Sequence, residues 1–131
     1  MTTKQFKLIG FTCGAIIISG VCCKAATIPD NLAVKAIMGE ACGEGYKGML
    51  AVAGAIRNRG TLQGVYGVKA THIYKEPAYV WANAKKAWKE SAKVDITKGA
   101  NHWEGTDFKR PAWSMGMKIT LRYKKHIFYK S

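Results

Sequence analysis

A run of small residues between positions 36 and 60 constrains the fold of this chain more than any other feature. Alanine and glycine recur throughout the run, and positions 49–56 within it are free of polar side chains. Glu40 lies near the start of the run, where an apolar stretch meets glycines at positions 43 and 45. A carboxyl group packed against apolar residues loses hydration, which favours its protonated form. Glu40 is therefore a candidate proton donor in catalysis.

The first 26 residues have the three-part layout of a secretory signal. Lys4 and Lys7 make the start basic, and an uncharged, mostly apolar run of 16 residues follows at 8–23. This run is short for a membrane span, so we expect cleavage near Ala25 or Ala26, with an uncleaved or lipidated anchor as the alternative. Residues 27–131 then form one exported domain, destined for the periplasm, the cell wall or the extracellular space.

Composition limits the kind of domain that residues 27–131 can form. Three of the four cysteines lie in the first 26 residues, so the remaining one, Cys42, cannot form a disulfide within the domain. The full chain has a formal net charge of +13, and the leader contributes three lysines and no acid, which leaves +10 for the domain. Such a domain suits an anionic partner, and charge alone does not choose among wall polymer, lipid headgroups and nucleic acid.

Apolar spacing and turn residues predict a mainly helical α+β domain that ends in a β-hairpin. Helices are expected over about 32–40, over about 46–59, and from Glu76-Pro77 to near Val94. Asp30 or Asn31 can cap the first helix, and Gly60 can end the second. Irregular structure is expected over 61–74 and in a loop through 98–111, and two alternating segments at 118–122 and 126–129 are typical of paired strands.

Ordered sequence blocks lie along residues 30–130. The first block is Gly-Glu-Ala-Cys-Gly-Glu at 39–44, followed by Gly48, the Ala-Val-Ala segment at 51–53, and Asn58-Arg59. Three later blocks follow it: Gly-Ala-Asn-His-Trp at 99–103, Pro-Ala-Trp at 111–113, and His-Ile-Phe-Tyr at 126–129. In this order the blocks resemble the SleB-type cell-wall hydrolases, a family of spore-cortex-lytic enzymes and related phage and bacterial proteins. The family usually has an arginine where this chain has Cys42.

This resemblance implies a small lysozyme-like fold and cleavage of the glycan strand of peptidoglycan, with Glu40 as the catalytic residue. It also implies the lytic transglycosylase route, in which one carboxyl group acts first as acid and then as base. The 6-hydroxyl of muramic acid attacks in this route, and the product is a 1,6-anhydro sugar. The alternative is muramidase-type hydrolysis, which requires a second carboxylate or a positioned water.

Four further residues are expected at the substrate site, and each has a structural alternative. Trp103 and Trp113 can stack on sugar rings or pack in the core. His102 can shape the groove through a hydrogen bond or shuttle a proton. Glu44 can contact substrate or serve as a cap or first-turn acid of the second helix. Arg59 is expected to hold a loop in place, with direct substrate contact as the alternative.

No cofactor and no metal are expected, because the three histidines and Cys42 lack the spacing of a ligand set. The domain is expected to be a monomer that binds peptidoglycan and no nucleic acid, and that contacts a membrane only through an uncleaved N-terminal segment. The competing hypothesis is a non-enzymatic cationic module that binds wall polymer, membrane or nucleic acid. Glu40 distinguishes the two hypotheses, because a pure binding module has no use for an acid in an apolar setting.

Overall fold

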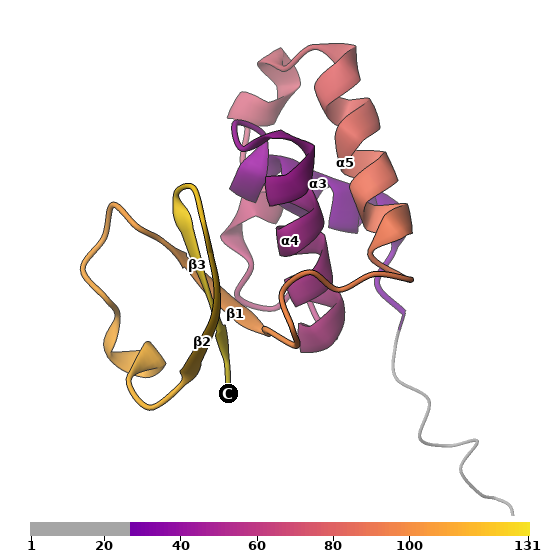
Figure 1. Ribbon diagram of the computed structural model, residues 1–131. Coiled ribbons are helices and arrows are strands. Elements are labelled where there is room, and N and C mark those ends of the chain that lie inside the picture. Colours follow the sequence, from indigo (N-terminus) through magenta and orange to yellow (C-terminus); the bar gives the residue numbers. More distant parts are fainter. Residues whose placement is uncertain (1–26) are drawn as a thin grey trace, which may run out of the picture.

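The computed structural model describes residues 27–131, in which three α-helices pack beside a three-stranded antiparallel sheet (Figure 1). The helices are α3 (Asp30–Ala41), α4 (Gly45–Arg59) and α5 (Ala78–Glu90), and the strands are β1 (His102–Gly105), β2 (Lys118–Tyr123) and β3 (His126–Lys130). Short 3₁₀ turns lie at η3 (Tyr66–Lys69), η4 (His72–Lys75) and η5 (Ala112–Ser114). The secretory signal expected at 1–26 lies outside the described residues.

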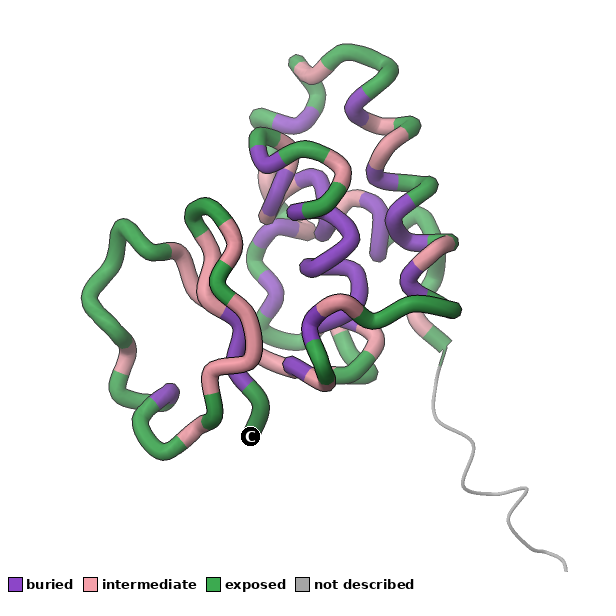
Figure 2. Tube along the Cα trace, in the orientation of Figure 1, coloured by how far each residue is buried: buried purple, intermediate pink, exposed green. Residues whose placement is uncertain are grey.

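The central helix α4 explains the run of small residues. Its positions 48–56 are all buried, and Figure 2 shows this continuous burial in the middle of the helical layer. A helix that is covered on every side can be approached closely by its neighbours only where its side chains are small. As the sequence predicts, the helix ends at Gly60, whose φ of 76° is in the left-handed region that glycine adopts without strain.

All three predicted helices are present, but two of their ends differ from the prediction. Asp30 lies in the first turn of α3 and makes no capping hydrogen bond; its Oδ1 accepts a hydrogen bond from Trp88 Nε1 at 2.8 Å. Helix α5 ends at Glu90 rather than near Val94. Arg57 contacts this end of the helix, where its guanidinium donates to Trp88 O at 2.6 Å and to Ser91 Oγ at 2.7 Å.

The sheet contains the predicted hairpin and one strand that the sequence did not indicate. Strands β2 and β3 pair as expected, and β1 pairs with the other edge of β3 to give the order β1-β3-β2. The prediction of a loop through 98–111 was therefore wrong at His102–Gly105. This strand has only four residues and depends on a partner later in the chain, with Trp103 opposite Phe128, so local pattern does not reveal it.

A hydrogen-bonded turn connects the end of α4 to the start of β1. Asn58 Nδ2 donates to Asp95 Oδ2 and to Ala100 O, both at 2.9 Å, and Asp95 also accepts hydrogen bonds from the backbone of Thr97 and Gly99. Burial raises the pKa of Asp95, but hydrogen bonds from Thr97, Asn58 and Gly99 outweigh burial and hold this pKa below its ordinary value. The turn therefore sets where β1 begins relative to α4.

Candidate active site

A pocket of about 370 Å³ lies between the helices and strand β1. Helix α3 contributes Glu40, the end of α4 contributes Arg59, and the segment before and into η3 contributes residues 64–66. The opposite wall consists of His102, Trp103 and Glu104 on β1 together with Trp113 on η5. The structure thus brings four of the five predicted site residues to one pocket: Glu40, His102, Trp103 and Trp113.

Both carboxyl oxygens of Glu40 accept a hydrogen bond. The backbone N–H of Gly67 donates to Oε2 at 2.8 Å, and the indole N–H of Trp103 donates to Oε1 at 2.9 Å. These donors belong to different walls of the pocket, since Gly67 lies on η3 and Trp103 on β1. The two bonds hold the carboxyl group in one orientation at the pocket.

Two glycines allow η3 to approach Glu40. A Cβ built on Gly39 would lie 2.0 Å from Gly67 O, and a Cβ built on Gly67 would lie 2.7 Å from Glu40 Cγ and 2.8 Å from Ala36 O. No side chain fits at either position unless the backbone moves. Gly67 carries the N–H that holds Glu40, and the sequence analysis did not identify it.

Trp103 occupies a strand rather than the expected loop, and it faces two environments. It lines the pocket and is partly buried against the hydrophobic core. Its position therefore combines the two alternatives that the sequence left open, a groove residue and a core residue. Its hydrogen bond to Glu40 adds a function that sequence reasoning did not foresee.

Hydrogen bonds around Asn101 identify the nitrogen that carries the proton in neutral His102. Asn101 Oδ1 accepts the backbone N–H of Ser131 at 3.2 Å, and Asn101 Nδ2 donates to Ser131 Oγ at 3.0 Å, which orients the amide. His102 Nδ1 lies 2.9 Å from the same Oδ1, so Nδ1 must be the donor. Nε2 is then left with a free lone pair in neutral His102. Burial and the nearby Arg59 charge lower the pKa of His102, which favours this neutral form.

Aromatic contacts support the outer part of the pocket. The ring of Trp113, which is 43% exposed, lies with its centroid 5.4 Å from that of His102 and meets the ring of Tyr129 edge-on at 5.5 Å. Arg59 donates to Gln63 O at 2.9 Å and to Asn101 O at 3.2 Å, and so links the segment before η3 to β1. This agrees with the expected loop-holding role of Arg59.

Glu44 does not line this pocket. It is buried at the N-cap position of α4, where it makes no capping hydrogen bond, and its Oε1 lies 3.2 Å from His126 Nδ1. Glu44 and Glu40 both border a second hollow of about 450 Å³, which Lys124 and Lys125 also line. Glu40 therefore faces two adjacent hollows, and Glu44 faces one of them.

Tyr66 and Glu104 also line the pocket around Glu40, and the sequence did not indicate them. Tyr66 is 79% exposed, and the Glu104 carboxylate accepts the backbone N–H of Gly105 at 2.9 Å. No periodic pattern marks Tyr66, because it lies in an irregular segment. Glu104 follows directly after the His-Trp pair of a family-like block, and this adjacency was the available signal.

The described residues give no support to a reactive cysteine or to a metal site. Burial, followed by the charge of Glu76, raises the pKa of the Cys42 thiol, which favours its protonated form. Within residues 27–131, no group of three or more His, Cys, Asp or Glu side chains is arranged to hold a metal ion. None of the described helices is long and apolar enough to cross a membrane.

Comparison with known proteins identifies two solved structures with this fold. The catalytic domain of the Bacillus cereus SleB protein is 26% identical, with a TM-score of 0.58 over 80% of this chain and 93% of that one. The catalytic domain of the germination-specific lytic transglycosylase SleB from Bacillus anthracis is 27% identical, with a TM-score of 0.58 over 77% of this chain and 93% of that one. No family model and no curated protein matches the sequence. Residues 27–131 therefore form an α+β domain with the SleB catalytic-domain fold.

Proposed function

We propose that this protein cleaves the glycan strand of peptidoglycan and that Glu40 is its catalytic residue. The observation that carries the proposal is the Glu40 carboxyl group, which lies in an aromatic-lined pocket with each oxygen held by a donor from a different wall. One solved relative with this fold is a lytic transglycosylase, which supports the same type of reaction.

In the proposed reaction, the protonated Glu40 gives its proton to the oxygen that links two sugars as the bond from that oxygen to C1 breaks. Positive charge develops on the sugar ring of the muramic acid. The 6-hydroxyl of the same sugar then bonds to C1, and its proton passes to the Glu40 carboxylate. The acid is thereby regenerated, the product carries a 1,6-anhydro bond, and no cofactor or water is consumed.

Substrate binding is proposed for the aromatic residues of the pocket and for the hollow beside it. Trp103 and Trp113 present ring surfaces to sugars, and the free Nε2 of His102 accepts a hydrogen bond from a sugar hydroxyl. Because Glu40 borders both hollows, a strand that crosses it has room on either side. Glu44 contributes to the adjoining hollow, and its carboxylate lies beside His126.

Hydrolysis is the second candidate function, because Glu104 places another carboxylate in the pocket. A hydrolase would use this group to activate water, whereas the transglycosylase route has no role for it. Mass spectrometry of fragments released from purified sacculi separates the two: anhydro ends support the transglycosylase, and reducing ends support the hydrolase.

The main test compares Glu40→Gln with Glu104→Gln on purified sacculi. Glu40→Gln keeps the size of the side chain and removes its titratable proton, so the rate should fall about 10²–10⁴-fold with an unchanged circular dichroism spectrum. Glu104→Gln should retain most activity if Glu40 acts alone. A folded Glu40→Gln protein with the parental rate would remove Glu40 from the mechanism.

A substrate outside the cytoplasm requires an exported protein, and the net charge of the domain suits the anionic wall. We propose that it acts there as a monomer, without metal or nucleic acid. If the parent protein bound sacculi and released no fragments, the non-enzymatic module would be the better description.

A further inference from the structure

A third hollow lies between the start of α3 and helix α5. It has a volume of about 900 Å³ and shares no lining residue with the catalytic pocket. Figure 1 shows the sheet and α5 on opposite sides of α4, so this hollow is remote from the β1 wall of the pocket. We call it the α3–α5 groove and define it by six of its lining residues: Val34, Lys35, Tyr74, Trp81, Lys85 and Lys89.

Aromatic rings form one part of the groove. Tyr74 is 64% exposed, and its ring centroid lies 6.3 Å from that of the partly buried Trp81, at an angle of 34°. The nearby Trp88 is buried and is covered by the guanidinium of Arg57, 3.7 Å from its ring centroid. Flat rings such as those of Tyr74 and Trp81 pack well against the C–H faces of sugars.

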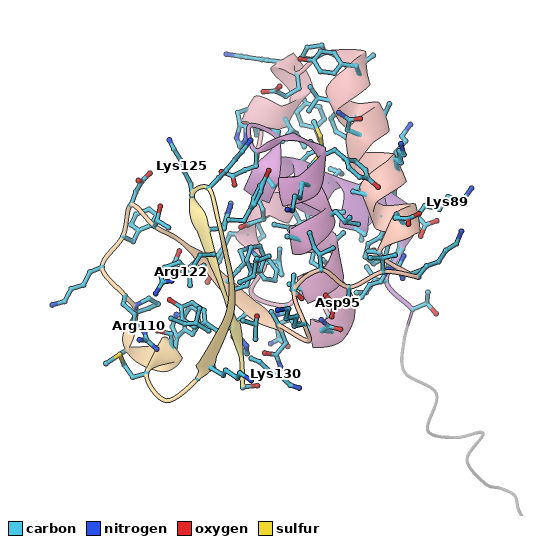
Figure 3. All side chains as sticks on the ribbon, in the orientation of Figure 1. Lys89, Asp95, Arg110, Arg122, Lys125 and Lys130 are labelled. Atoms are coloured by element: carbon cyan, nitrogen blue, oxygen red, sulfur yellow. The ribbon has the colours of Figure 1, made fainter. Side chains whose placement is uncertain are left out.

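Lysines form the other part. Trp81, Lys85 and Lys89 are four residues apart on α5, so they share one face of that helix. Figure 3 shows Lys89 on the α5 side of the molecule, away from the labelled basic residues of the sheet region. The acid that lines the groove, Asp30, is already bonded to Trp88 Nε1. Within residues 27–131, no carboxylate forms a salt bridge with Lys35, Lys85 or Lys89, so these charges remain available to a ligand.

We propose that the α3–α5 groove is a second peptidoglycan-binding site, which holds a glycan strand that is not being cleaved. Tyr74 and Trp81 stack on its sugars, and the lysines pair with carboxylates of its peptide stems. The identity of the ligand rests on the proposed function. Two binding sites on one domain make the second contact intramolecular, so the protein stays on the wall between cuts.

The shape of the groove favours a strand over a lipid surface. A bilayer is flat and is contacted by residues that protrude, whereas these aromatic and basic side chains line a hollow. The hollow is also within the size range of sites that enclose most of a bound small ligand. Single-stranded nucleic acid also stacks on aromatic rings, so it is included among the tested ligands.

The experiment compares Lys85→Glu with Lys86→Glu, each in the non-cleaving Glu40→Gln protein. Lys86 is adjacent on α5 but lies outside the groove, with its Nζ 5.2 Å from the Tyr46 ring centroid. The two variants have the same net charge and differ in the position of the reversed charge. In binding isotherms on purified sacculi, Lys85→Glu should raise the apparent Kd about three- to tenfold, and Lys86→Glu should change it less than about twofold.

A second pair tests the aromatic part. Trp81→Ala should weaken binding by a similar factor, whereas Tyr79→Ala removes a ring that is 69% exposed and outside the groove and should not. Because Trp81 also packs against the core, its thermal unfolding is measured alongside. If Trp81→Ala does not fold, the lysine pair still decides the question.

Three results would overturn the proposal. If Lys85→Glu and Lys86→Glu raised the apparent Kd for sacculi equally, the effect would come from net charge and not from the groove. If neither variant changed this Kd, the groove would have no part in binding sacculi. If Lys85→Glu lost binding to phosphatidylglycerol vesicles or to oligothymidine but still bound sacculi, the groove would be assigned to a lipid or nucleic-acid partner instead. These assays measure binding and need no catalysis. A negative binding result therefore counts against the groove alone, whereas parental activity in Glu40→Gln would refute the proposed function.

Discussion

The two walls of the pocket around Glu40 are built differently. On the helical wall, Glu40 lies at the end of α3, which is anchored by fully buried residues such as Ala36 and Ile37. Gly39 and Gly67 bring η3 so close to this helix that neither position has space for a side chain. The sheet wall is formed by His102, Trp103 and Glu104, which are only partly buried, and by the exposed Trp113. The proposed proton donor is therefore backed by buried residues of the helical wall, and most proposed sugar contacts lie on the partly buried residues of the sheet wall.

This difference predicts two kinds of mutational effect. Changes on the helical wall should disturb the Glu40 carboxyl group and lower kcat, because they alter the group that acts in the transition state. Changes on the sheet wall should act mainly on KM, because they alter surfaces that hold the substrate before and during reaction. Trp103 is the instructive exception, since it belongs to the sheet wall and donates a hydrogen bond to Glu40.

Among changes that leave Glu40 itself in place, Gly67→Ala should have the largest effect. Its Cβ would lie 2.7 Å from Glu40 Cγ, so η3 must move away, and the N–H that holds Oε2 moves with it. We expect kcat to fall by about 10²-fold and the unfolding free energy to fall by about 1–3 kcal/mol. Chemical denaturation and initial rates on sacculi measure both effects.

Gly43→Ala is the matched control for stability, because a Cβ at Gly43 would meet no atom within 4 Å. Its unfolding midpoint should stay close to that of the parent. Normal stability and a normal kcat in Gly67→Ala would show that the glycine contact does not hold the Glu40 carboxyl group, and the contrast between the walls would then be lost.

Trp103→Phe and Trp103→Ala separate the two roles of this residue. Phenylalanine keeps a ring against the core and the pocket but removes the N–H that donates to Glu40 Oε1. We expect Trp103→Phe to lower kcat about tenfold with little change in KM, since the lost hydrogen bond would stabilise the carboxylate that forms as Glu40 gives up its proton. Trp103→Ala should also raise KM and reduce stability.

Steady-state kinetics on sacculi and thermal unfolding measure these effects. An unchanged kcat in Trp103→Phe would mean that the indole N–H is dispensable and that the tryptophan serves only as a wall.

The residues that could be predicted from the sequence share one property: their signal is local. The helix α4, its end at Gly60 and the β2–β3 hairpin each follow from spacing within a few residues. Glu40, His102, Trp103 and Trp113 were selected from compact blocks, and the pocket contains all four.

The features that were missed depend on contacts between distant segments. Strand β1 forms because β3 is available beside it, and Gly67 matters because Gly39 lets η3 approach α3. Nothing near Gly67 in the sequence shows that its N–H meets a carboxyl group. Glu44 shows that closeness in sequence does not guarantee closeness in the site. It is four residues from Glu40, yet its carboxylate is buried beside His126.

Salt should weaken binding of the protein to sacculi and leave the rate of the chemical step unchanged. Figure 3 shows Arg110, Arg122, Lys125 and Lys130 in the sheet region. Between about 0.1 M and about 1 M salt, the screening length falls from about 10 Å to about 3 Å. We expect KM for sacculi to rise at least about threefold over this range while kcat changes little. An unchanged KM would show that the net charge does not contribute to substrate binding.

The smallest expected effect concerns His102 on the sheet wall. Burial and the Arg59 charge lower its pKa from the ordinary value of 6.5, so the unfolded chain takes up this proton at a higher pH than the native protein does. Between the two pKa values the unfolded state binds more protons, and stability therefore falls as the pH drops below about 6.5. His102→Gln removes this contribution, so its unfolding free energy should decline less over the same interval, as measured by urea unfolding at stepped pH. Nitrogen-15 NMR of the parent should show the proton on Nδ1 at neutral pH, because Asn101 Oδ1 accepts it. A proton on Nε2, or titration above 6.5, would contradict the arrangement around Asn101 and leave His102 without the free acceptor that the proposed sugar contact requires.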